Sequence, residues 1–253
     1  MKVFLTGATS GVGEALARHY AAQRATLGLF ARREPELVRL AAALAPATVA
    51  TYAGDVRDAE ALANAGADFI ARFGTPDVVI ANAGVSRGTL TDEAADLPAI
   101  RAVFDTNVLG IVHTFSPFLA AMRRERRGVL AGIASVAGFR GIPGAGAYSA
   151  SKAAAINYLE SLRVELVGSG VAAVTICPGY IATPLTANNP YRMPFLLAPE
   201  KAARLIARAI ARRRRFYVLP WQMALVGRVL RCLPRPLFDR ALANRKRKPR
   251  QPE

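Results

Sequence analysis

Short apolar runs alternate with helical patterns along the first 180 residues, and this alternation constrains the fold more than any other feature. The runs typical of buried strands are Val3–Leu5, Thr26–Phe30, Thr48–Tyr52, Val78–Ala81, Gly128–Ile133 and Ala172–Cys177. Helical patterns lie between them near 12–23, 34–44, 58–73, 93–124 and 148–168. Repeated strand–helix order predicts a parallel sheet with helices on both faces, which is a Rossmann-type, doubly wound α/β fold.

The pattern changes after Pro178. Four prolines within 184–199 predict an irregular segment, which we interpret as a substrate lid. A helix near 200–214, a strand at Phe216–Leu219 and a helix over Trp221–Leu233, ended by Pro234 and Pro236, follow. We therefore expect a dinucleotide-binding and catalytic domain over 1–215 and a short, basic, partly amphipathic helical extension over 216–253.

Composition narrows the cellular setting. No apolar run reaches the ~18 residues of a membrane span, and the first residues enter a strand rather than a signal peptide. Two cysteines, Cys177 and Cys232, form no disulfide framework. The two histidines lack ligand partners at useful spacing, so we expect no metal site. These features predict a cytoplasmic protein.

A glycine-rich turn follows the first strand, in the order Thr6, Gly7, Ala8, Thr9, Ser10, Gly11, Val12, Gly13. Glycine lets the backbone turn tightly and approach a ligand closely. The next helix begins here, so its free N–H groups and positive dipole end face the turn. The turn therefore predicts a diphosphate site, although its spacing differs from the common dinucleotide fingerprint.

Two arginines, Arg32 and Arg33, follow the second strand. In dinucleotide-binding folds an acidic residue here holds the ribose of NAD, whereas arginine accommodates the 2′-phosphate of NADP. A guanidinium suits phosphate because its N–H groups donate in pairs. The arginines favour NADP(H), although Glu34 beside them would neutralise part of their charge.

Tyr148 and Lys152 stand four residues apart in a helical pattern, and Ser135 precedes the tyrosine by thirteen residues. Four residues make about one helical turn, so both side chains would share a helix face. An ammonium beside a phenol favours the phenolate and lowers its pKa from about 10. The pair predicts general acid–base chemistry, with Lys152 lowering the pKa of Tyr148.

These motifs together resemble the short-chain dehydrogenase/reductase family in its classical form, over about residues 1–200. The glycine turn resembles the family's cofactor turn, and Asp55-Val56 resembles its adenine contact. Asn82-Ala83-Gly84 resembles a family turn in which Ala81 replaces the usual first asparagine. Asn107, Ser135, Tyr148 and Lys152 resemble the catalytic tetrad. The cofactor-binding residues that the resemblance implies are Gly7, Thr9, Ser10, Gly11, Val12, Gly13, Arg32, Arg33, Asp55, Val56, Asn82, Ala83, Gly84, Tyr148, Lys152, Pro178, Gly179, Ile181 and Thr183.

The resemblance implies a mechanism. Tyr148 exchanges a proton with the substrate oxygen, and Ser135 donates a hydrogen bond to that oxygen. Lys152 assists the tyrosine and binds the nicotinamide ribose, while Asn107 holds a water. The expected activity is hydride transfer between NADP(H) and a carbonyl or secondary alcohol. The alternative is a cofactor-bound regulatory or interaction protein without turnover.

The loop 138–146 lies between Ser135 and Tyr148, and its Phe139, Ile142 and Pro143 are candidates to line an apolar substrate pocket. These side chains, with those of the lid, favour a small apolar or lipid-like substrate. The resemblance also implies a homodimer or homotetramer formed through the helices near 93–124 and 148–168.

The excess positive charge lies at the C-terminus. Residues 201–253 hold 16 of the 34 basic residues and two of the 18 acidic ones. Leu225, Val229 and their neighbours give Trp221–Leu233 a wide apolar arc flanked by arginines. Three interpretations remain open: packing of the arc on the body or on a second subunit, peripheral attachment of 221–250 to the inner face of a membrane, and nucleic-acid binding. The last is weakest, because no aromatics alternate with the terminal cations.

Overall fold

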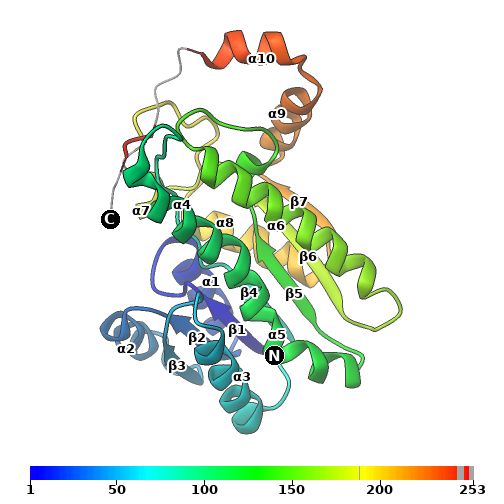
Figure 1. Ribbon diagram of the computed structural model, residues 1–253. Coiled ribbons are helices and arrows are strands. Elements are labelled where there is room, and N and C mark those ends of the chain that lie inside the picture. The colour runs from blue at the N-terminus through cyan, green and yellow to red at the C-terminus, as the bar shows by residue number, and fades with distance from the viewer. Residues whose placement is uncertain (188, 244–247, 251–253) are drawn as a thin grey trace.

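The sheet carries seven parallel strands in the order β3-β2-β1-β4-β5-β6-β7 in the computed structural model, which describes residues 1–187, 189–243 and 248–250 (Figure 1). The strands are β1 (Lys2–Thr6), β2 (Thr26–Ala31), β3 (Val49–Ala53), β4 (Val78–Ala81), β5 (Val129–Ile133), β6 (Ala172–Pro178) and β7 (Phe216–Leu219). The chain begins near the middle of the sheet and winds outward in both directions. The predicted doubly wound fold is confirmed.

Helices cover both faces of the sheet. They are α1 (Gly11–Ala21), α2 (Glu34–Ala43), α3 (Ala59–Phe73), α4 (Leu97–Phe104), α5 (Gly110–Arg124), α6 (Gly146–Glu165), α7 (Pro184–Ala187), α8 (Pro199–Ala211), α9 (Trp221–Cys232) and α10 (Arg235–Leu242). Leu16 of α1, Leu37 of α2 and Ile206 of α8 belong to one buried cluster. Phe69 of α3 and Phe118 of α5 belong to the other. The two clusters fill the space on opposite faces of the sheet, as the apolar strands require.

The stretch expected as a single helix over 93–124 is divided into four parts. A short 3₁₀ turn (Ala94–Asp96) precedes α4, and a π-helical turn (Asp105–Leu109) separates α4 from α5. A helical hydrophobic period does not distinguish α winding from one π turn. Such turns are often found at functional sites, and this one carries Asn107.

The C-terminal part differs from the expectation in two ways. Phe216–Leu219 pairs with β6 as the seventh strand, so the sheet extends beyond the boundary expected at residue 215. A second helix, α10, follows α9 where a helix end was expected. Pro234 is the N-cap residue of α10 and Pro236 lies in its first turn, where proline is tolerated. In Figure 1, α9 and α10 lie next to each other at the top of the view, far from β3 at the other edge of the sheet.

No helix in the described ranges is both long and apolar enough to span a lipid bilayer.

Candidate active site

The glycine turn lies at the carboxyl end of β1, where it meets the N-terminus of α1. Gly7 and Gly11 have φ angles of +67° and +56°, which favour glycine. A Cβ on Gly13 would lie 2.0 Å from the Gly7 carbonyl oxygen, so only glycine fits there. The N-cap residue Ser10 makes no side-chain hydrogen bond to the first turn of α1. The turn thus leaves a compact cradle of backbone donors that suits a diphosphate.

The turn after β4 is tied to the glycine turn. The Asn82 side-chain amide donates to the carbonyl oxygens of Thr6 at 3.1 Å and Gly7 at 3.2 Å. A Cβ on Gly7 would lie 2.8 Å from the Ala83 Cα atom. These contacts fix the two turns at the switch point between β1 and β4, which is where ligands bind in such sheets.

Both arginines after β2 are exposed, and Arg33 reaches the glycine turn. Its Nη2 donates to the Thr9 carbonyl at 3.4 Å and hydroxyl at 3.3 Å, while Nη1 pairs with Glu36 at 3.3 Å. Arg32 lies close enough to Asp55 to act on its pKa. Burial opposes ionisation of Asp55, but hydrogen bonds from Arg57 and the charges of Arg57 and Arg32 outweigh it and lower that pKa. Arg33 therefore borders the cradle, and Arg32 lies near Asp55.

Val56, the neighbour of Asp55, is buried, and its carbonyl oxygen lies 2.9 Å from His113 Nδ1. The histidine thus contributes to local structure. Thr183 lies beside the glycine turn, because a Cβ on Gly11 would be 2.9 Å from its Cγ2 atom. The structure therefore brings the predicted cofactor residues of β1, β2, β4 and the segment after β6 to one edge of the sheet.

Asn107 is fully buried below the turn after β4. Its side chain accepts from the Val85 N–H at 2.9 Å and donates to the Val85 carbonyl at 2.9 Å and to Ser151 Oγ at 3.0 Å. Ser151 Oγ in turn donates to the Tyr148 carbonyl at 2.8 Å. Sequence reasoning missed Ser151, although it lies within the Tyr148–Lys152 motif, because a serine inside a helix carries no distinctive signal.

Lys152 is also buried, and its Nζ donates to the Ile133 carbonyl at the end of β5 at 2.9 Å. Nζ lies 5.9 Å from the centre of the Tyr148 ring. A Cβ on Gly84 would be 3.5 Å from Nζ and 3.2 Å from Asn107 Oδ1. The structure thus places Lys152, Asn107 and Gly84 together.

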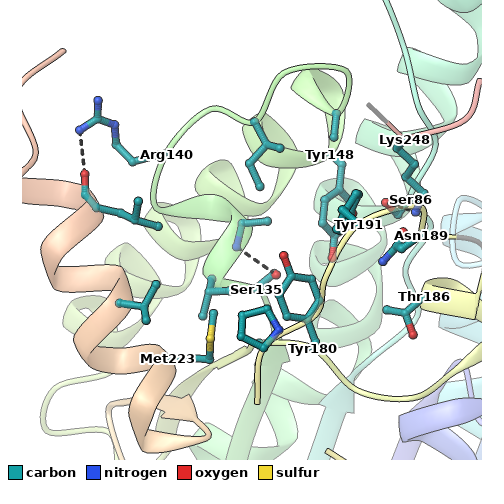
Figure 2. A pocket seen from close by; sticks show the side chains of 18 of the residues that line it. Ser86, Ser135, Arg140, Tyr148, Tyr180, Thr186, Asn189, Tyr191, Met223 and Lys248 are labelled. Atoms are coloured by element: carbon teal, nitrogen blue, oxygen red, sulfur yellow. Dashed lines mark hydrogen bonds between the residues drawn. The ribbon is translucent and has the colours of Figure 1, made fainter. Parts of the chain in front are cut away.

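Ser135 is held at the carboxyl end of β5. Its Oγ accepts from the Ala137 N–H at 3.1 Å (Figure 2). The same Oγ donates to the Pro178 carbonyl at 3.4 Å. Ser135 is also close enough to Tyr148 to lower the pKa of its hydroxyl, against the larger effect of burial, and both residues line the same cavity. The two hydroxyls are therefore neighbours, as a shared interaction with one substrate oxygen requires.

The expectation that Lys152 lowers the pKa of Tyr148 is wrong for the protein alone. Burial raises that pKa, with the opposing effect of the Ser135 hydrogen bond too small to cancel it. Burial also lowers the pKa of Lys152 to about 8, against a small opposing effect of Cys177. Burial thus makes the charged form of Lys152 less favourable. Its Nζ donates to a carbonyl and lies 5.9 Å from the centre of the Tyr148 ring.

Ser135 and Tyr148 open into a cavity of about 460 Å³, a size that suits a small organic ligand. Its wall comes from the loop after β5, the segment after β6 and the helices α9 and α10. Gly179, Tyr180 and Tyr191 line it beside the two hydroxyls, and Ile181 is buried beneath, bridging to Leu197. Most of the lining is apolar, so the cavity can hold an apolar substrate body.

The C-terminal helices form one wall of this cavity. Met223, Val226 and Leu230 of α9 and Phe238 of α10 line it (Figure 2 labels Met223). Arg140 joins them to the loop 138–146, because its Nη1 donates to the carbonyls of Leu230 at 2.8 Å and Leu233 at 3.0 Å.

Not every residue expected in the pocket wall is there. Ile142 lines the cavity, but Phe139 and Pro143 do not. Phe139 instead packs against Gly227 of α9 and stacks with Phe216, at 6.1 Å between ring centres. The loop sequence alone could not show this packing, because α9, against which Phe139 packs, begins about 80 residues later.

Comparisons with known proteins place the chain in a family. Residues 1–193 match the short chain dehydrogenase family. An uncharacterized oxidoreductase from Myxococcus xanthus is 41% identical over 239 residues, covering 94% of each chain. Dehydrogenase/reductase SDR family member 7B from Bos taurus is 33% identical over 269 residues, covering 98% of this chain and 82% of that protein. The chain belongs to the short-chain dehydrogenase/reductase family of oxidoreductases, whose members bind a nicotinamide cofactor.

Solved structures agree with this assignment. An alcohol dehydrogenase from Thermococcus sibiricus, complexed with 5-hydroxy-NADP, superimposes with a TM-score of 0.76 at 28% identity, covering 86% of this chain and 94% of that one. A 3-ketoacyl-ACP reductase from Sinorhizobium meliloti gives 0.78 at 26% identity, covering 86% and 96%.

The buried Lys152 predicts a pH dependence of stability. Its pKa of about 8 in the fold lies below the value of 10.5 in an unfolded chain. Between these pH values the unfolded chain keeps a proton that the folded protein releases, so the free energy of unfolding should rise with pH by up to about 1.4 kcal/mol per pH unit. Urea unfolding of the wild type and Lys152→Met at pH 8.0, 8.7 and 9.4 measures this. A difference between the two proteins that stays constant with pH would contradict it.

Proposed function

We propose that this protein is an NADP(H)-dependent oxidoreductase that transfers a hydride between the nicotinamide and a carbonyl or secondary alcohol on a small, apolar or lipid-like substrate. The observation that carries the proposal is the neighbouring pair of Ser135 and Tyr148 hydroxyls in the wall of a mainly apolar cavity, with buried Lys152 and Asn107 behind them.

The proposed roles follow from these positions. In reduction, the Tyr148 hydroxyl donates its proton to the carbonyl oxygen, and the Ser135 hydroxyl donates a hydrogen bond to the same oxygen as it gains charge. Lys152 holds a proton at Nζ behind the tyrosine, and Asn107 fixes the backbone at Val85. The bound nicotinamide supplies or accepts the hydride. Burial keeps Tyr148 protonated in the protein alone, which is the form needed to donate.

The cofactor contacts are assigned to the same edge of the sheet. The turn 7–13 would hold the diphosphate, Asp55 and Val56 would contact the adenine, and Asn82, Ala83, Gly84 and the segment 178–183 would hold the nicotinamide half. Preference for NADP(H) rests on Arg33, which touches Thr9 of the turn, and on Arg32 near Asp55.

Exchange of Tyr148 for phenylalanine removes the exchangeable proton and keeps the ring. We expect Tyr148→Phe to lose at least about 100-fold in kcat with NADPH and a ketone, because general acid catalysis contributes on that scale. NADPH affinity, measured by fluorescence titration, should change less than about threefold. A panel of ketones, fatty acyl ketones and sterols, followed by NADPH absorbance, supplies the substrate. Near-normal turnover by the variant would refute the assigned role, and a cellular role unaffected by the change would favour the regulatory alternative.

Arg33 provides the test of cofactor choice. Arg33→Ala should raise the Kd of NADPH about tenfold or more, because a charge-assisted contact to the 2′-phosphate is lost. The Kd of NADH should change little, since it lacks that phosphate. Arg39→Ala on α2 is a control that removes the same charge outside the site. Equal losses for both cofactors, or tighter wild-type binding of NADH, would overturn the NADP(H) assignment.

We propose a homodimer or homotetramer through α4, α5 and α6. Leu97 of α4, Leu109 of the π turn before α5 and Val164 of α6 expose 51%, 47% and 58% of their surface, which a second copy would cover. Light scattering after size-exclusion chromatography measures the mass, and a monomer at micromolar concentration would contradict this.

Peripheral attachment to an anionic membrane surface is the second proposal for this chain. Part of the apolar arc of α9 lines the cavity, but Trp221, Leu225 and Val229 expose 72%, 58% and 56% of their surface. Exposed Arg228 and Arg235 lie in the same helix pair. Apolar side chains flanked by cations suit the headgroup region of anionic lipids.

Sedimentation with vesicles tests this attachment. The wild type should pellet with phosphatidylcholine/phosphatidylserine vesicles and less with phosphatidylcholine alone. The double variant Trp221→Gln/Leu225→Gln should lose most of the bound fraction. The matched double variant Val38→Gln/Val167→Gln changes exposed apolar residues elsewhere. Equal pelleting of the two double variants would remove the proposal.

A further inference from the structure

The terminal segment 248–250 returns to the body of the protein and is anchored there by Arg250. Its guanidinium contacts the Asp96 carboxylate at 3.0 to 3.3 Å and Glu93 at 3.0 Å. The Asp96 side chain is only 1% exposed, so its charge needs the partner that Arg250 supplies. A parallel bridge between Gly88 and Arg250 adds a backbone contact. The sequence gives no local signal for this, because the partners lie 154 and 157 residues apart.

This anchor brings Lys248 into the wall of the cavity that holds Tyr148 and Ser135. Its Nζ donates to Ser86 Oγ at 2.8 Å and to the Leu185 carbonyl at 3.4 Å. Figure 2 shows Lys248 beside Ser86, on the opposite side of the view from Arg140. A Cβ on Gly88 would lie 2.4 Å from the Lys248 carbonyl oxygen, so only glycine permits this close approach of the two backbones.

The charge of Lys248 is poorly compensated. Both of its acceptors are neutral, and an ammonium has a third N–H to donate. None of the described cavity-lining residues is acidic. Burial lowers the pKa of Lys248, and no acidic group in the described part of the chain opposes that shift.

Arg140, the other half-buried cation of the wall, is in a different position. It caps the carboxyl end of α9 through two carbonyls, and its guanidinium lies 4.1 Å from the centre of the Phe238 ring. Lys248 has one carbonyl and one hydroxyl acceptor and, among the described residues, no aromatic contact, so it keeps an N–H that a ligand can satisfy. Arg192, the third cation of the lining, is exposed.

We propose that Lys248 is a specificity residue, positioned by the ion pairs of Arg250, that binds an oxyanion at the end of the substrate away from the reacting carbonyl. The substrate class is then an apolar ketone or alcohol that carries a carboxylate or a phosphate. This rests on the proposed function for the reacting end, but binding of the anionic end can be measured without turnover.

Equilibrium dialysis with the full-length protein measures that binding. The three probes share one alkyl chain length and differ in the head group: decanoate, decyl phosphate and 1-decanol. The wild type should bind at least one of the two anions more tightly than decanol. Lys248→Met should raise the Kd of that anion about tenfold, the loss of one charged hydrogen bond, and leave decanol within twofold. Lys248→Arg should keep most of the preference. Arg250→Ala should lose it too, because Lys248 is no longer anchored.

Arg240→Met is the matched control, since it removes one exposed cation of α10 and should leave all three affinities unchanged. The proposal is overturned if the wild type shows no preference for either anion, if Lys248→Met and Arg240→Met behave alike, or if Lys248→Met binds the anions more tightly. The last result would identify the terminal segment as an obstruction of the cavity. The preferred anion tells carboxylate from phosphate. A protein that shows this binding but reduces no ketone in the substrate panel would refute the proposed function and leave this inference standing.

Discussion

The hydrogen bond from the buried Lys152 ammonium to the Ile133 carbonyl links the sheet directly to the site. It joins the carboxyl end of β5 to the first turns of α6, and so sets where Tyr148 lies relative to Ser135. A buried cation is costly unless it is paired or hydrogen-bonded. Here a neutral carbonyl, rather than a carboxylate, accepts its hydrogen bond. Burial therefore lowers the pKa of Lys152 to about 8. Keeping Lys152 protonated at neutral pH therefore lowers the free energy of unfolding.

That arrangement changes the usual explanation of the tyrosine. Spacing along a helix suggests that Lys152 acts on Tyr148 by charge alone, but burial acts on both groups and disfavours both charged forms. In the protein alone the tyrosine is a proton donor with a raised pKa. Any shift toward the phenolate must come from charge that arrives with the cofactor. In the proposed mechanism, the protonated Tyr148 of the protein alone is the form that donates a proton to a carbonyl oxygen.

The sequence predicted the features that local patterns determine. The six apolar strands, the glycine turn and the Tyr148–Lys152 pair all follow from the period and chemistry of neighbouring residues. What it missed depends on contacts between distant segments. Ser151 matters only because Asn107 reaches it, and the π turn that carries Asn107 has the same hydrophobic period as an α-helix. Phe139 was expected in the pocket, but α9 takes it up.

The C-terminal part shows why its composition was ambiguous. Its apolar arc is wide because α9 serves two environments: Met223, Val226 and Leu230 face the cavity, while Trp221, Leu225 and Val229 remain exposed. Its cations also have two environments: Arg250 pairs with the buried Asp96 carboxylate, whereas Arg228 is exposed. Arg245, Lys246 and Arg247, part of the predicted basic surface, lie outside the described residues. A segment that both closes the cavity and exposes an apolar face couples substrate entry to whatever covers that face. If the proposed membrane attachment holds, a long apolar substrate from the lipid surface would meet the cavity beside α9, whose Met223, Val226 and Leu230 line it.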